Sequence, residues 1–304
     1  MKNQSVVKML PDGSRATVHP FHVTIEATDD LVLCRKDEDY DAYVKILAMV
    51  AIRKNVILVT YAVMSNHSHE VCLARSYFIA KEFGDEVKRM YSMYLQGKYG
   101  LRKVMIGLEV NVQVIDSVIY LRNALAYDTR NVIEIGENPD IYKWTAHRAM
   151  FRGGATLPGL RPLSSMNVRE GQKIMHTNMD MKSSTLGVNQ DNELEPYTFC
   201  DFEYFESAFN GDQSFYYKIV GLVNVSEMRY KLVEVQKKKL NDTDFIKTVD
   251  ELSVRWFSKK ITDITDQQKA RLLPYVYHTT KTTPGQLARC LGLGTELVMR
   301  LLGK

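Results

Sequence analysis

Hydrophobic residues in the first part of the chain alternate between the spacing of strands and that of helices. Residues 17–28, 56–64 and 67–74 are rich in apolar and β-branched side chains, which predicts three strands. A fourth strand is expected near residues 110–114. Pro20 lies in the first of these strands and predicts an edge position or a bulge there, because proline cannot donate a ladder hydrogen bond.

Helical segments separate these strands. Apolar side chains recur every three or four positions in residues 37–54, and acidic residues open that segment. A long second helix is predicted at residues 77–99, before a glycine. A third helix is predicted at residues 116–127, with Asp116 or Ser117 as its N-cap. Elements in this order favour two packed layers, a sheet against helices.

Periodicity weakens after residue 151. Residues 152–213 are polar, with several glycines and prolines, which predicts a connector between domains. Residues 214–304 are predicted to be helical. The lysine run at 237–239 is expected to be a solvated helix face, although it could lie against phosphates.

Capping residues delimit two short helices at residues 283–302. Thr283 is the predicted N-cap of the first, with Pro284 at its first position, and Thr295 is the predicted cap of the second. Gly292 supplies the turn between them. This pattern predicts a DNA-binding helix-turn-helix, and the alternative is a helical hairpin that closes a core.

The composition is that of an ordinary globular protein, with 304 residues, 45% apolar and 25% charged. The four cysteines are far apart, which favours reduced thiols over a disulfide framework or a zinc knuckle. A net charge of +4 permits a nucleic-acid partner without requiring one. No apolar run is long enough to span a bilayer and no apolar signal segment follows Met1, so the cytoplasm is the expected location.

The stretch His67-Ser68-His69 carries the most specific chemistry. It follows an apolar strand and a bend at residues 64–66. Because alternate strand residues point to the same face, His67 and His69 are predicted to project together and to bind one metal ion. The alternative is two unrelated histidines at the entrance of a strand.

Five segments together resemble the single-tyrosine HUH transposases, and most closely the REP-associated tyrosine transposases of bacteria. They are FHVTIEAT, the run from DEDYDAY to NHSHEVCL, KRMYSMYLQGKYG, VIYLRNALAY and IYKWTAHRAMF, within residues 17–151. The resemblance implies an α+β fold, with a ferredoxin-like nuclease domain at residues 1–151. That domain has an antiparallel sheet with helices on its faces, and an all-α region follows it.

The resemblance also implies a reaction. Such enzymes cut single-stranded DNA when a tyrosine hydroxyl attacks a phosphodiester, forms a 5′-phosphotyrosine and releases a 3′-hydroxyl. Tyr120 is the implied nucleophile, and Tyr127 is the alternative. His67 and His69 would hold Mg²⁺ or Mn²⁺, with Asn123 as a candidate third ligand.

Several features depart from the family pattern, two of them near the implied nucleophile and the histidine pair. The family helix usually reads Tyr, three residues, Asn-Pro, whereas Tyr120 and Asn123 are separated by two residues and Ala124 stands in place of the proline. Ser65 replaces the proline that usually precedes the Asn-His-x-His run.

Single-stranded or hairpin DNA is the expected partner, with the protein a monomer or homodimer and no membrane partner. Tyr91, Tyr94 and Tyr99 are expected either to stack on unpaired bases or to pack in the core. His22 is expected on the same sheet face as the histidine pair, in a structural role. The basic side chains expected at phosphates, each of which could equally be a solvated surface charge, are Lys88, Arg89, Lys98, Arg122 and Arg148.

Three functions fit these features. The main prediction is an active DNA endonuclease and strand-transferase of the transposase kind. The first alternative is a domesticated or degenerate relative that binds hairpin or repeat DNA without cutting it. The second is a metal-dependent phosphodiesterase that uses water, leaves no protein–DNA adduct and survives Tyr120→Phe.

Overall fold

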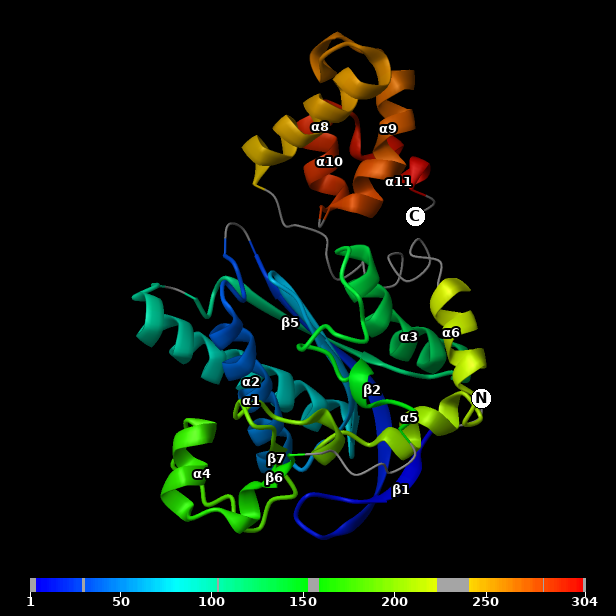
Figure 1. The fold of residues 1–304 in the computed structure, drawn as a ribbon. Helices are drawn as coiled ribbons and strands as arrows, with labels where there is room; N and C mark the ends of the chain where they lie inside the picture. The colour runs from blue at the N-terminus through cyan, green and yellow to red at the C-terminus, as the bar shows by residue number, and fades with distance from the viewer. Residues whose placement is uncertain are drawn as a thin grey trace. The chain divides into compact units, whose positions relative to one another are not determined.

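The computed structural model of the chain describes residues 4–28, 31–102, 104–152, 159–222, 241–280 and 282–302. It divides into two compact units, Met1–Val223 and Asn224–Lys304. The first unit is a mixed α+β structure built on an antiparallel sheet, and the described part of the second unit is helical (Figure 1).

The long strand β2 (Arg15–Ala27) is the centre of the sheet. It pairs along one side with β4 (His67–Ala74) and along the other with β5 (Leu108–Val114), because the same residues of β2 face both partners. Strand β3 (Ile57–Val63) pairs with β4, which gives the lateral order β5-β2-β4-β3 with every neighbour antiparallel. A short strand β1 (Val6–Met9) pairs with the first residues of β2.

The four predicted strands are therefore present, with small differences at their ends. Pro20 lies inside β2, between the residues that pair with β1 and those that pair with β5. Its carbonyl accepts a hydrogen bond from the amide of Ile115 at 3.1 Å. The proline is tolerated within a central strand because it stands where one partner strand gives way to the next.

Helices α1 (Asp37–Arg53) and α2 (Tyr77–Tyr99) cover one face of the sheet (Figure 1). Both agree with the predicted segments. Helix α2 begins at the N-cap Ser76 and ends at Gly100, whose φ of 64° is the left-handed conformation that favours glycine.

Helix α3 (Val118–Glu134) covers the opposite face, with α5 (Phe202–Ala208) and α6 (Gln213–Leu222) beside it (Figure 1). Ser117 is the N-cap, as one of the two predictions had it. The helix continues well beyond the predicted end at residue 127. Its last turns hold Asp128 and Thr129, which are polar yet buried, so the hydrophobic pattern gave no sign of them.

The described part of residues 152–213, which the sequence predicts to be a connector, lies within the first unit. The amide of Asp201 donates to the carbonyl of Leu58 on β3 at 2.7 Å, and Phe199 stacks on Tyr61 with ring centroids 5.7 Å apart. The other elements of this part are β6 (Arg161–Pro162), α4 (Val168–Met175) and β7 (Gly187–Val188). Single 3-10 turns occur at His147–Ala149, Leu163–Ser165 and Pro196–Thr198.

The second unit contains α8 (Asp242–Phe257), α9 (Asp266–Thr279), α10 (Pro284–Leu291) and α11 (Thr295–Leu301), with a 3-10 turn at Ile261–Asp263. In its described residues, a cluster of buried apolar side chains forms a core to which α8, α9, α10 and α11 all contribute. None of the helices described in either unit is long and apolar enough to cross a membrane.

The two short helices predicted at residues 283–302 are confirmed as helices. Thr283 caps α10 by accepting a hydrogen bond from the Gln286 amide, and Gly292 ends it with a φ of 65°. Thr295 is the first residue of α11, not its cap, and Gly294 occupies the cap position. The lysine run at 237–239 lies outside the described residues.

Candidate metal and nucleophile site

His67 and His69 project from the same face of β4, as strand alternation predicts. Their ring centroids are 4.9 Å apart with an interplanar angle of 77°. His69 is fully buried, whereas His67 is half-buried beside the exposed Asn66, whose Oδ1 lies 2.7 Å from its Nδ1. The pair therefore reaches from the interior of the unit to its surface.

On the same face of the sheet, polar side chains of the neighbouring strands lie beside the two histidines, in rows that run across the strands. One row joins His69 to Thr24 on β2 and Asn111 on β5. The next row joins His67 to Glu26 on β2 and then to Glu109 on β5. The four-stranded sheet thus places imidazole nitrogens and carboxylate and amide oxygens side by side, which are the atom types that divalent ions bind.

A third histidine, His22, completes the cluster. Its Nε2 lies 3.2 Å from the Nδ1 of His69, and the hydroxyl of Thr24 lies 3.4 Å from the same nitrogen. Burial lowers the pKa of His22 and of His67 to about 4, and it also lowers the pKa of His69 well below its ordinary value. All three rings are therefore neutral at pH 7, which is the form that can bind a metal.

Helix α3 crosses this polar face from β5 to β3. Near its start, the hydroxyl of Tyr120 donates to Oε1 of Gln113 on β5. Two turns later, the ring of Tyr127 stands edge-on to His69 on β4, with centroids 5.0 Å apart. Near its end, Val132 packs against Ala62 of β3.

The spacing of the two tyrosines matches the spacing of the strands. Seven residues of helix rise about 10 Å, and two steps across a sheet span about 9.6 Å. Tyr120 and Tyr127 thus lie on the same side of α3 but above different strands. The structure brings Tyr127, the alternative nucleophile, against His69, whereas Tyr120 bonds to Gln113 on β5, two strands away from β4.

Asn131 is a residue that the sequence interpretation missed. It follows Tyr127 by one helical turn, is 6% exposed, and has a side-chain nitrogen without a hydrogen-bond partner among the described residues. The signal was available, because Tyr127 and Asn131 are separated by three residues, as in the family pattern, with Val132 in place of proline. Asn123, the predicted ligand, lies one turn before Tyr127 and is half-buried.

The reverse face of β4 is also polar, which is unusual for a buried strand. The hydroxyls of Ser68 and Tyr43 lie 2.6 Å apart, and Tyr43 also donates to Oε1 of Glu70 at 3.3 Å. Glu70 is fully buried, and its other oxygen has no partner among the described residues. Burial raises the pKa of Glu70 to about 8, although the hydrogen bonds from Ser68 and Tyr43 lower it.

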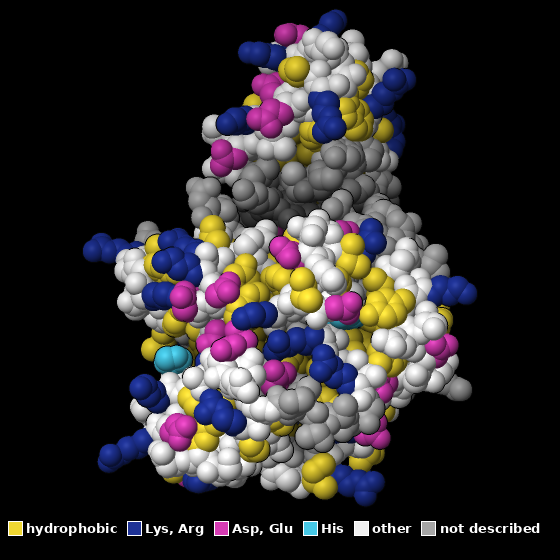
Figure 2. Space-filling model, in the orientation of Figure 1, with side chains coloured by type: hydrophobic (Ala, Val, Ile, Leu, Met, Phe, Trp, Pro, Cys, Tyr) yellow, Lys and Arg dark blue, Asp and Glu magenta, His cyan; other side chains and the backbone are white. Residues whose placement is uncertain are grey.

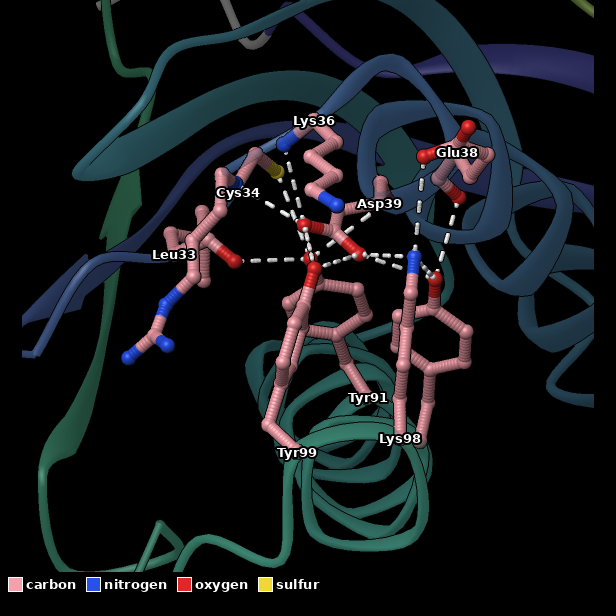
Figure 3. Close-up of polar contacts among 10 residues, drawn as sticks. Leu33, Cys34, Lys36, Glu38, Asp39, Tyr91, Lys98 and Tyr99 are labelled. Carbon is pink, nitrogen blue, oxygen red and sulfur yellow. Dashed lines mark hydrogen bonds and ion pairs between the residues drawn. The ribbon is translucent and has the colours of Figure 1, made fainter.

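Asp39, at the start of α1, is the centre of a buried polar clamp (Figure 3). Burial raises the pKa of its carboxyl, but the hydrogen bonds outweigh that effect and hold the pKa at about 2. Its oxygens accept hydrogen bonds from the backbone amides of Arg35 (2.9 Å) and Lys36 (3.1 Å), from the hydroxyls of Tyr94 (2.9 Å) and Tyr99 (2.8 Å), and from Nζ of Lys98 (2.7 Å).

The clamp is linked to the turn before His67 through the loop that precedes α1. The hydroxyl of Tyr91 donates to the carbonyl of Leu33 at 2.7 Å (Figure 3). The next amide in the chain, that of Cys34, donates to the carbonyl of Ser65 at 3.0 Å. The end of α2 therefore supports the bend from which the histidine strand begins.

Most of the basic side chains predicted at DNA phosphates are engaged within the protein. Arg89 bonds to Glu86 at 2.7 Å, and Lys98 belongs to the Asp39 clamp. Arg122 donates to the carbonyl of Ala208 at 2.6 Å, and Arg148 lies 3.5 Å from Glu195. Lys88 is half-buried and has no ion pair with another described residue.

The three tyrosines near the end of α2, Tyr91, Tyr94 and Tyr99, are likewise engaged within the protein. Tyr91 is fully buried, and the hydroxyls of Tyr94 and Tyr99 are held by Asp39. Lys and Arg side chains lie among Asp and Glu across the face drawn in Figure 2, rather than gathering into one basic surface. Any contact with a phosphate backbone on that face must therefore depend on individual side chains.

The donor set fits a divalent ion in part. Nε2 of His69 is buried and has no hydrogen-bond partner among the described residues, which leaves that nitrogen available to an ion. No group of three or more His, Cys, Asp or Glu side chains with metal-binding geometry occurs in the described ranges. His67 and His69 would therefore need an amide, a water or a substrate oxygen to complete the shell. No protein-family model, curated protein or solved structure matches this chain.

Proposed function

We propose that the protein cleaves and rejoins single-stranded DNA through a covalent bond to Tyr127, with a divalent ion on His67 and His69. The edge-on contact between Tyr127 and His69 is the observation that carries this proposal. It brings a phenol and two neutral imidazoles together on one side of the sheet, and Asn131 follows Tyr127 by one turn of α3.

The strand connectivity supports a ferredoxin-like fold of the HUH kind. Along the chain the elements run β2-α1-β3-β4-α2-β5, and their lateral order is β5-β2-β4-β3. In such a split β-α-β arrangement the two central strands are the first and third. The third, β4, carries the histidine pair, so the pair lies at the middle of the sheet and beneath α3.

The reaction that we propose conserves the number of phosphodiester bonds. The Tyr127 oxygen attacks the phosphorus and loses its proton, a phosphorus–oxygen bond forms, and the bond to the 3′-oxygen breaks as that oxygen takes up a proton. A bound divalent ion would polarise the scissile phosphate and offset its developing charge. His67 and His69 would hold that ion, and the apolar packing of α3 on the sheet keeps the phenol oriented.

The capped helices α10 and α11 are proposed to be a helix-turn-helix that adds affinity for duplex or hairpin DNA. Their short length, the left-handed Gly292 between them and the buried Leu287 and Val298 support this assignment. Single-stranded DNA with a hairpin is therefore the proposed substrate class.

Incubation of the protein with Mn²⁺ and a hairpin-bearing single-stranded oligonucleotide tests the proposal. A protein–DNA adduct that survives denaturing electrophoresis, together with a free 3′-hydroxyl, is the expected result. Nicking without an adduct would indicate a water-using phosphodiesterase instead.

A second candidate is a relative that binds the same DNA without cutting it. The observation that favours it is the closure of the site, because His69 is fully buried and Tyr127 is only 5% exposed. DNA binding without nicking in either Mg²⁺ or Mn²⁺ would identify this function.

A further inference from the structure

His22 and His69 form a hydrogen bond between two neutral imidazoles. The Nε2 of His22 and the Nδ1 of His69 are 3.2 Å apart, and the ring planes are tilted by 35°. Both side chains are buried, at 1% and 0% exposure. A neutral imidazole has one N–H and one lone pair, so a single hydrogen lies between the facing nitrogens, and one ring must donate while the other accepts.

The direction of this bond decides whether His69 can bind a metal. If His22 donates, the proton of His69 must be on Nε2, and that nitrogen has no lone pair to offer. If His69 donates from Nδ1, its Nε2 has a free lone pair. Nδ1 of His22 and Nε2 of His69 have no hydrogen-bond partner among the described residues. One buried N–H therefore lacks a partner in either arrangement: it is on Nε2 of His69 if His22 donates, and on Nδ1 of His22 if His69 donates. The two arrangements are therefore close in free energy, and an ion at Nε2 selects the second.

We propose that His22 is a positioning residue that accepts the Nδ1–H of His69 and thereby holds the tautomer whose Nε2 binds the divalent ion. This inference rests on the metal site of the proposed function. Metal-binding histidines usually donate their second N–H to a carboxylate, a carbonyl or a water. Here the acceptor is another imidazole on the adjacent strand β2, two residues before Thr24, which is the residue of β2 that pairs with His69.

Thr24 is the only competing acceptor among the described contacts of this nitrogen. Its hydroxyl lies at 3.4 Å, which is too long for a strong hydrogen bond, whereas His22 lies at 3.2 Å. The sheet fixes both distances, because His22 and Thr24 are alternate residues of β2, which pairs with β4 throughout this region. His22 should therefore contribute more than Thr24 to holding the proton of His69 on Nδ1.

The experiment combines calorimetry of Mn²⁺ binding with nitrogen NMR of the histidine rings, using diamagnetic Zn²⁺ as the probe for NMR. His22→Leu removes the acceptor, His22→Gln restores an acceptor oxygen, and Thr24→Val is the control. We expect His22→Leu to weaken Mn²⁺ binding by about 10- to 100-fold. His22→Gln should recover most of that affinity, and Thr24→Val should bind Mn²⁺ almost as tightly as the wild-type protein. In the Zn²⁺-bound wild-type protein, His69 should carry its proton on Nδ1.

Several results would overturn the inference. Equal losses in His22→Leu and His22→Gln would mean that His22 acts only through packing, and unchanged binding in both would mean that it does not act at all. If His22→Leu does not fold, the NMR spectrum of the wild-type protein decides, because a Zn²⁺-bound His69 with its proton on Nε2 contradicts the proposal. A wild-type protein that binds neither ion would overturn the metal site itself, and with it the proposed function.

Discussion

The phenol ring of Tyr127 stands at 86° to the imidazole of His69, with ring centroids 5.0 Å apart. The two residues come from different elements, and the contact depends on where α3 crosses the sheet. A phosphate held by the histidine pair would meet the tyrosine of this turn of the helix and not the one two turns earlier.

Tyr127→Phe should therefore abolish the covalent adduct with DNA, whereas Tyr120→Phe should retain it. Each substitution removes one hydroxyl and keeps the ring, so both variants should fold. Adduct yield on a denaturing gel, with Mn²⁺ and a hairpin oligonucleotide, is the measurement. An adduct that vanishes in Tyr120→Phe and persists in Tyr127→Phe would assign the nucleophile to Tyr120 and require a different position of α3.

His67→Ala and His69→Ala should each remove Mn²⁺ binding measured by calorimetry, because one imidazole alone holds a divalent ion weakly. His176→Asn is a suitable control, since that histidine is exposed and belongs to the end of α4. Binding that survives in both alanine variants would place the ion elsewhere.

Glu70 should make the stability of the fold depend on pH. Its pKa is about 8 in the folded protein, against an ordinary value of 4.5, so its contribution to stability is full below pH 4.5. That contribution is lost as the pH rises through 8, at up to about 1.4 kcal/mol per pH unit.

Glu70→Gln keeps the shape of the side chain and removes this ionisation. Chemical denaturation should show the variant gaining stability over the wild-type protein between pH 5 and pH 8.5. The exposed Glu137→Gln should show no such gain. A constant difference between Glu70→Gln and wild type across this range would mean that Glu70 stays ionised in the folded protein.

Asp39→Asn should lower the free energy of unfolding by about 2 kcal/mol or more, because a buried carboxylate with charge-assisted hydrogen bonds is replaced by a neutral amide. Asp37→Asn, at an exposed position of the same helical turn, should cost much less. Urea denaturation of both variants at pH 7 is the measurement. Equal effects would mean that the clamp adds nothing beyond the charge at the start of the helix.

A chain that ends at residue 222 should still form the adduct but bind hairpin DNA more weakly and with a smaller dependence on salt. A chain that ends at residue 210 should fail to fold well. It lacks Tyr216, a fully buried residue of α6 whose hydroxyl meets Thr129 and whose ring packs on Phe205. Loss of the adduct in a folded chain ending at residue 222 would make the second unit part of the active site.

Local signals in the sequence predicted the elements well where capping and periodicity agree. Helix α2 runs between an N-cap serine and a left-handed glycine, and both are visible in the sequence. The end of α3 was not predictable in this way. Thr129 is buried because it bonds to His147 and Tyr216, which are 18 and 87 residues away, and no local pattern contains those partners.

The site was predictable in part for a similar reason. The shared face of His67 and His69 follows from strand alternation alone. Which tyrosine contacts the histidines depends on the angle at which α3 crosses the four strands. Tyr120 and Tyr127 both lie on the side of α3 that faces the sheet, so the sequence alone could not choose between them. Lys98 was expected at DNA because it is basic and near the end of a helix, but Asp39, 59 residues away, engages it.

The Asp39 clamp has a consequence for local opening of the site. The amides of Ala27 and Cys34 donate to carbonyls of the bend at residues 64–66, and the clamp holds the segment just after Cys34 against the end of α2. The bend, that segment and the last turn of α2 should therefore exchange their amide hydrogens as one cooperative unit. If DNA binds as proposed, a strand that must reach the buried His69 would depend on this shared opening, and its rate would limit how fast that residue can be reached.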